Sequence, residues 1–210
     1  MEFLRTYTAV EFERKSGEDR VEVFEDGPNC VIALADGFGG RAGAAAAADG
    51  LIDAVRAARS SILDLLNPEH WYRLLRSADK LIHDDANAGE TTAVVVAITP
   101  DGVGGASVGD SGAWIVTADR MFDVTAAQMR KPGLGTAMAQ PVPFRAGPLD
   151  GTLLVASDGL FKYATPPAIC DCVRRDELAA IPRRLIDAVR MPSGGLQDDV
   201  AVAVARWVDE

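Results

Sequence analysis

Residues 30–37 read Cys-Val-Ile-Ala-Leu-Ala-Asp-Gly, an almost unbroken apolar run that ends in an acidic residue and a glycine. Residues 153–159 repeat the arrangement as Leu-Leu-Val-Ala-Ser-Asp-Gly. Apolar runs of about four to eight residues that end at Gly, Asp or Pro are typical of buried β-strands. Both stretches therefore predict strands that place a carboxylate at their end.

Further strands and helices follow from the spacing of the apolar residues along the chain. Strands are predicted over residues 6–12, 20–24, 30–35, 92–99, 105–108, 113–117, 152–157 and 200–207, and helices over 41–59, 69–86, 166–175 and 176–189. Pro182 would lie in the first turns of the last helix or break it. The order lacks regular strand–helix alternation, so an α+β fold with mixed, mostly antiparallel sheets flanked by helices is expected. Residues 125–150, rich in Gly, Pro, Ala and Met, predict a loop.

The composition narrows the class of protein. A length of 210 residues fits one domain over residues 1–210. The net charge of −10 argues against nucleic acid or an anionic membrane as a partner. The odd cysteine count, with Cys30, Cys170 and Cys172, favours free thiols in a reducing compartment. Neither a signal peptide nor an apolar run of roughly 20 residues is found, so a cytoplasmic location is expected.

Acidic residues gather at the ends of the predicted strands. They are Glu18, Asp19, Asp36, Asp110, Asp158, Asp198 and Asp199. Any one of them is most simply a turn residue, because Asp and Gly favour turns. Hard divalent cations, however, prefer oxygen ligands, and glycine allows close approach of the backbone. Several such strand ends in one chain favour a metal site.

The sequence motifs around these residues resemble those of the metal-dependent protein phosphatases of type 2C, and the resemblance extends over about residues 8–206. Six motifs occur in the family's order: Arg14-Lys15-Ser16-Gly17-Glu18-Asp19, Asp36-Gly37-Phe38-Gly39-Gly40, Gly89-Glu90-Thr91-Thr92-Ala93, Val108-Gly109-Asp110-Ser111, Leu154-Val155-Ala156-Ser157-Asp158-Gly159-Leu160 and Asp198-Asp199-Val200-Ala201. The resemblance implies a four-layer α/β/β/α sandwich with two central mixed, mostly antiparallel sheets.

The resemblance also implies roles for individual residues. Two Mn²⁺ or Mg²⁺ ions, with a third at a weaker site, would be held by Glu18, Asp19, Asp36, Gly37, Asp110, Asp158 and Asp198. Asp36 would bridge two ions and take part in catalysis, with the Gly37 carbonyl beside it. Asp158 and Asp198 would hold the ion on the other side, Glu18 and Asp19 would act largely through water, and Asp110 would line the third site. Arg14 would bind the phosphate with its planar guanidinium.

The sequence departs from the family in several places. Phe38 stands where one branch has a histidine, Gly112 where an arginine is usual, and Asp199 where an asparagine is usual. Neighbouring side chains on a strand point to opposite faces, so Asp198 is predicted to bind metal and Asp199 only to orient a loop. Asn at position 199 should therefore be tolerated. The stretch between residues 111 and 158 is short, so the flap subdomain is expected to be reduced or absent.

The function that the resemblance implies is hydrolysis of phosphoserine or phosphothreonine in proteins through a metal-activated water. The substrate would be a phosphorylated protein, such as the target of a bacterial serine/threonine kinase. Two alternatives stay open. One is a pseudophosphatase that serves as a binding or regulatory module, and the other is an unrelated carboxylate–metal hydrolase acting on a small phosphoester.

Overall fold

The computed structural model describes residues 2–13, 17–38 and 43–209, and it contains two sheets of five strands each. Sheet A has the strand order β1 (Phe3–Glu11), β10 (Val200–Val208), β9 (Thr152–Ala156), β6 (Gly112–Val116) and β7 (Met121–Asp123). Sheet B has the order β2 (Asp19–Asp26), β3 (Asn29–Asp36), β4 (Ala93–Thr99), β5 (Gly102–Val108) and β8 (Val142–Ala146). Every pairing between these strands is antiparallel.

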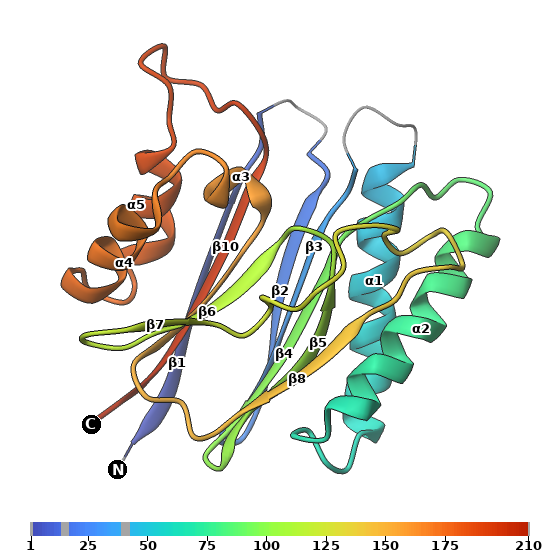
Figure 1. Cartoon of the computed structure of the whole chain (residues 1–210), viewed down its shortest axis with the longest axis horizontal. Coiled ribbons are helices and arrows are strands. Elements are labelled where there is room, and N and C mark those ends of the chain that lie inside the picture. Colours follow the sequence, from blue (N-terminus) through green and yellow to red (C-terminus); the bar gives the residue numbers. More distant parts are fainter. Residues whose placement is uncertain (1, 14–16, 39–42, 210) are drawn as a thin grey trace.

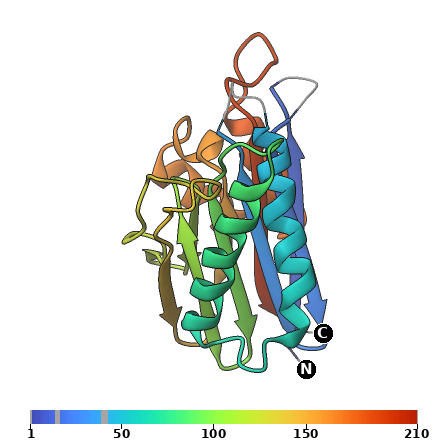
Figure 2. The same cartoon turned by 90° about the vertical axis from the view of Figure 1, so that its right-hand side faces the viewer.

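Helices cover the two outer faces of the sheets (Figure 1). Beside sheet B lie α1 (Ala44–Ala58), the short 3-10 helix η1 (Arg59–Ser61) and α2 (Pro68–Asp84); beside sheet A lie α3 (Asp158–Phe161), α4 (Pro166–Arg175) and α5 (Ile181–Ala188). Figure 2 shows α1 and α2 side by side across the outer face of sheet B. The predicted four-layer sandwich is confirmed, but the expected parallel pairing does not occur among the described strands.

Burial on both faces of each sheet explains why the strands read as unbroken apolar runs. In β4, Val94 and Val96 pack between the two sheets, whereas Val95 packs against α1 and α2. A third apolar cluster lies between sheet A and α3–α5. In an antiparallel sheet with one solvent-exposed face, apolar and polar residues would instead alternate along each strand.

Local signals fix several helix ends. The Asn67 side chain accepts a hydrogen bond from the Glu69 N–H at 3.1 Å and caps α2, with Pro68 at the first helical position. The predicted helix over 176–189 begins only at Ile181, because Asp176 already ends α4. Pro182 lies in the first turn of α5, one of the two expected outcomes.

The predicted loop over residues 125–150 contains one strand that the sequence did not indicate. Strand β8 (Val142–Ala146) pairs with β5 at the edge of sheet B and includes Pro143. Proline lacks an N–H donor and is therefore found on edge strands, so its presence hid the strand.

The strand register gathers the acidic motifs at one end of the sandwich. Asp19 at the start of β2 pairs with Asp36 at the end of β3. The ends of β5 and β9 lie at this same end, because Val108 pairs with the first residue of β4, and Ala156 pairs with Gly112 of β6. Antiparallel pairing thus brings alternate strand ends, and the carboxylates attached to them, to one edge.

Candidate metal centre

Four more acidic side chains act electrostatically on Asp36, which ends β3. Desolvation by burial raises the pKa of Asp36 well above its usual value, and the nearby negative charge of Asp19 raises it further. Smaller contributions in the same direction come from Asp158, Asp198 and Asp110. The structure therefore gathers five of the predicted metal ligands around one point.

Asp19 is the most deeply buried member of this group, with 1% of its surface exposed. Burial raises its pKa to about 7; a hydrogen bond with Ser157 acts in the opposite direction, and the charges of Asp199 and Asp158 add to the rise. Its Oδ2 atom is buried and has no hydrogen-bond partner among the described residues. A buried oxygen without a partner is costly, and a cation is the partner that a carboxylate accepts most readily. The donor set thus fits a divalent cation that prefers oxygen ligands.

The cluster is not a closed coordination shell as it stands. No three His, Cys, Asp or Glu side chains within the described ranges are arranged tightly enough to hold a metal ion. A lysine lies between two of the carboxylates: Lys162 Nζ is 2.5 Å from Asp158 Oδ2 and 3.3 Å from Asp198 Oδ2. Lys162 also lowers the pKa of Asp158, although burial outweighs it and the net shift of Asp158 is upward.

The two glycines that follow acidic strand ends allow close backbone contacts. A Cβ on Gly37 would lie 2.7 Å from the Ala44 carbonyl oxygen, in the first turn of α1. A Cβ on Gly159 would lie 2.0 Å from the Asp199 carbonyl oxygen. Any side chain at either position would push apart segments that carry the acidic residues, which explains both Asp-Gly pairs physically.

Buried hydroxyl groups hold the strand ends together. Thr92 accepts a hydrogen bond from the Asp36 N–H at 3.0 Å, and its hydroxyl lies 2.8 Å from that of Ser111. Ser157 accepts a hydrogen bond from the Ala201 N–H at 2.9 Å and so ties β9 to the start of β10. These side chains fix the backbone from which the carboxylates project.

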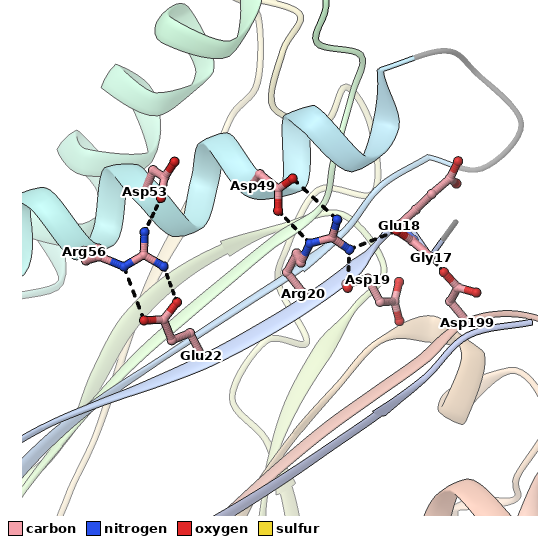
Figure 3. Close-up of polar contacts among 9 residues, drawn as sticks. All are labelled: Gly17, Glu18, Asp19, Arg20, Glu22, Asp49, Asp53, Arg56 and Asp199. Atoms are coloured by element: carbon pink, nitrogen blue, oxygen red, sulfur yellow. Dashed lines mark hydrogen bonds and ion pairs between the residues drawn. The ribbon is translucent and has the colours of Figure 1, made fainter. Parts of the chain in front are cut away.

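Arg20 anchors the segment that leads to Asp19 (Figure 3). Its Nε donates to Asp49 of α1 at 2.6 Å, and its Nη1 donates to the carbonyl oxygens of Gly17 and Asp19, each at 2.9 Å. The guanidinium thus connects the helix to the acidic edge of β2. One planar group with several donors suits this bridging role.

Asp198 and Asp199 both precede β10, so strand alternation does not apply to them, but their side chains have different surroundings. The two carboxylate oxygens of Asp199 accept the backbone N–H groups of Glu13, at 2.8 Å, and Glu18, at 2.6 Å. Asp198 instead faces Lys162 and the other carboxylates. Asp199 therefore orients the chain around Glu18. Because both of its oxygens are used, an amide could not replace it fully, and complete tolerance of Asn is no longer expected.

The chain between β7 and β8 passes beside Asp110. Arg130 Nη2 lies 3.3 Å from Asp110 Oδ2, and the Gly109 N–H donates to the Met129 carbonyl at 2.8 Å. Lys131 Nζ lies 5.7 Å from the centre of the Phe38 ring, where one branch of the resembled family has histidine. Two basic residues of this segment therefore flank the acidic cluster.

Arg14 and Glu18 are the two remaining predicted site residues, and three further residues near the site had no predicted role. Arg14, the expected phosphate ligand, lies outside the described residues. Glu18 directly precedes β2 and is partly exposed. Lys162 was not predicted as a site residue, although it lies four residues after Asp158 at a helix start, a spacing that places two side chains on the same helix face. Ser157 was part of a quoted motif but was given no role, and Arg130 carried no signal of its own, because its partner is distant in sequence.

Neither a protein-family model nor a curated protein matches the chain. Similar solved structures include the catalytic domain of the serine/threonine phosphatase PstP in complex with two manganese ions, which has a TM-score of 0.79 and 23% identity over 100% of both chains. Stp1 from Staphylococcus aureus has a TM-score of 0.82 and 18% identity over 100% of this chain and 96% of that one. PppA of Pseudomonas aeruginosa has a TM-score of 0.78 and 18% identity over 98% of each. At such identities the likeness shows a shared fold, that of bacterial serine/threonine phosphatases.

Proposed function

We propose that the chain is a single metal-dependent phosphatase domain that hydrolyses phosphoserine or phosphothreonine in proteins. The observation that carries the proposal is the convergence of Asp19, Asp36 and Asp158 at one end of the sandwich, with the Asp19 Oδ2 atom buried and unpaired. Burial and the neighbouring negative charges disfavour the ionised form of such a group, and a cation beside it would favour that form. The shared fold with phosphatases, one of them solved with two manganese ions, supports this assignment.

The proposed ligand roles follow the positions of the side chains. Asp36, whose neighbours include all the other site aspartates, would bridge two ions with the Gly37 carbonyl beside it. Asp158 and Asp198 would hold one side, Asp19 and Glu18 would hold water, and Asp110 would line a third, weaker site. When bound, a pair of Mn²⁺ or Mg²⁺ ions supplies a lowered water pKa and neutralises charge on the phosphoryl group.

Other residues of the chain would bind and position the substrate. Asp199 accepts the backbone N–H groups of Glu13 and Glu18. We propose that Arg14, which lies outside the described residues, binds the phosphate. The short segment that carries Arg130 and Lys131 stands in place of a full flap subdomain. Its positive charges would attract a phosphorylated, acidic stretch of a protein substrate. The proposed substrate is the target of a bacterial serine/threonine kinase.

The second candidate function is that of a pseudophosphatase, and one observation favours it. The ammonium group of Lys162 already lies between two of the proposed ligands. A permanent ion pair there would leave the fold as a binding or regulatory module.

Phosphopeptide hydrolysis with Mn²⁺, with Mg²⁺ and with chelator separates these functions. We expect turnover of phosphoserine and phosphothreonine peptides that needs either metal and stops with chelator. Nucleotides and small phosphoesters serve as the comparison, and faster hydrolysis of these would favour a small-molecule phosphoesterase. If the folded protein hydrolyses none of the substrates, with or without metal, the result would favour the pseudophosphatase.

The location and the partners of the domain are proposed from its helices, its cysteines and its net charge. Among the described helices, none is long and apolar enough to cross a membrane. The three cysteines are free, and a reducing compartment such as the cytoplasm is the proposed location. Neither nucleic acid nor a membrane is a proposed partner, because the net charge is −10.

A further inference from the structure

Lys162 is built into the acidic cluster by the short helix that begins at Asp158. Its backbone N–H donates to the Asp158 carbonyl oxygen at 2.8 Å, so one helical turn separates the two residues. Residues four apart on a helix lie on the same face, and the lysine side chain therefore returns over Asp158. Its Nζ reaches Asp158 Oδ2 at 2.5 Å.

The same ammonium group also reaches a carboxylate from a distant part of the chain. Asp198 precedes β10, and its Oδ2 lies 3.3 Å from Lys162 Nζ. Its other oxygen, Oδ1, accepts the Asp199 N–H at 3.1 Å, which fixes the direction of the side chain. Lys162 thus joins the two carboxylates that we assign to one side of the metal pair.

The contact differs from an ordinary surface ion pair in its burial. The Asp158 side chain is 12% exposed, whereas the side chains of Lys162 and Asp198 are 45% and 44% exposed. The carboxylate that receives the shorter contact is therefore the one most removed from water, where a paired charge matters most. The lysine stem remains open to solvent, so the ammonium group can move away without unpacking the core.

We propose that Lys162 is a tethered counter-ion that competes with a divalent cation for Asp158 and Asp198. The inference rests on the proposed function, since it concerns the same ligands. An ammonium group and a metal ion cannot occupy the space between two carboxylates together, and their positive charges repel. Lys162 therefore stabilises the fold without metal and weakens metal binding by Asp158 and Asp198 most. Metal binding near Asp19, which Lys162 does not contact, would be affected less.

Titration of Mn²⁺ into the whole chain by calorimetry tests this competition, with thermal melts in chelator as a second readout. In Lys162→Gln we expect the Mn²⁺ site at Asp158 and Asp198 to bind about tenfold more tightly, because the competing charge is gone. The same variant should melt at a lower temperature in chelator and gain more from Mn²⁺ than the wild type does. Lys162→Arg keeps the charge and should retain weak binding.

Lys80→Gln is the matched control, since it removes the same charge from an exposed position on α2. An Mn²⁺ affinity of Lys162→Gln that equals or falls below that of Lys80→Gln would overturn the inference, even if the wild type hydrolyses phosphopeptides. Mn²⁺ binding by Lys162→Gln but not by the wild type would support it and assign the wild type to the pseudophosphatases. Absence of Mn²⁺ binding in every variant would overturn both the inference and the proposed function.

Discussion

Asp79 and Asp19 are both buried carboxylates, but their surroundings are opposite. Asp79 on α2 is 0% exposed and accepts four backbone N–H groups, three on Oδ1 and one on Oδ2, at 2.8–3.1 Å. Asp19 is 1% exposed, and its Oδ2 has no partner among the described residues. The difference separates structure from function. A carboxylate that accepts four backbone N–H groups, with the Arg76 guanidinium 3.9 Å away, holds the chain in place, whereas an incompletely satisfied one among other acids needs a cation.

The four donors to Asp79 come from residues 135–139, in the segment between β7 and β8. Gly135 and Ala137 there have positive φ angles of 99° and 59°. The carboxylate thus stabilises a conformation that the backbone alone would not favour. Because the same segment carries Arg130 and Lys131, Asp79 supports the acidic site from a distance without taking part in it.

The largest expected effect is on turnover. Asp36→Asn should lower phosphopeptide hydrolysis by about a thousandfold or more, since the bridging position would lose its charge. The same change should raise the melting temperature in chelator, because it removes a charge that its neighbours oppose. Initial rates and melts of the same preparations check both. Full activity in Asp36→Asn would remove Asp36 from the site.

Asp79→Ala should have the largest effect on folding stability. Four N–H groups, one in a buried hydrogen bond and three in partly buried ones, would lose their acceptor, at a cost of about 3–5 kcal/mol. The melting temperature should fall by roughly 10 °C for a domain of this size, with or without Mn²⁺. Asp79→Asn keeps the oxygen that could accept three of the four donors and should fall less. Complete recovery of Asp79→Ala by Mn²⁺ would contradict the distinction between the two carboxylates.

The apolar runs of the sequence predicted the central strands well, because β3, β4, β5, β6, β9 and β10 are buried on both faces. The sandwich itself was implied by the family resemblance. The sequence also located the acidic edge, since Asp36 and Asp158 follow such runs directly. The contacts of Asp79 were beyond its reach, because they join a helix to a loop about sixty residues further on. Strand β8 was missed because Pro143 interrupts it between Val142 and Phe144, and its pairing with β5 cannot be read from the local sequence.

The pH dependence of folding stability tests the assignment of Asp19 as an incompletely satisfied carboxylate. The folded-state pKa of Asp19 is about 7, above the unfolded value of about 4. Between these values the folded state holds more protons, so in chelator stability should fall as pH rises from about 4 to about 7, by at most about 1.4 kcal/mol per pH unit for one proton. Urea unfolding of the wild type and Asp19→Asn across this range measures the difference. An identical pH profile for the two proteins would assign the excess proton elsewhere.

The smallest expected effect distinguishes the two adjacent acids before β10. Asp199 binds the N–H groups of Glu13 and Glu18 with separate oxygens. Asp199→Asn keeps one acceptor and turns the other position into a donor, so about 1–2 kcal/mol of stability should be lost, with a severalfold drop in turnover. Asp198→Asn should lose less stability and far more activity, because its Oδ2 faces the cluster and only its Oδ1 accepts a backbone N–H, that of Asp199. Parallel Mn²⁺ titration and urea unfolding of the two variants give the comparison. If Asp199→Asn loses the metal while Asp198→Asn retains it, then Asp199 binds the cation, and its contacts with the backbone are incidental to that role.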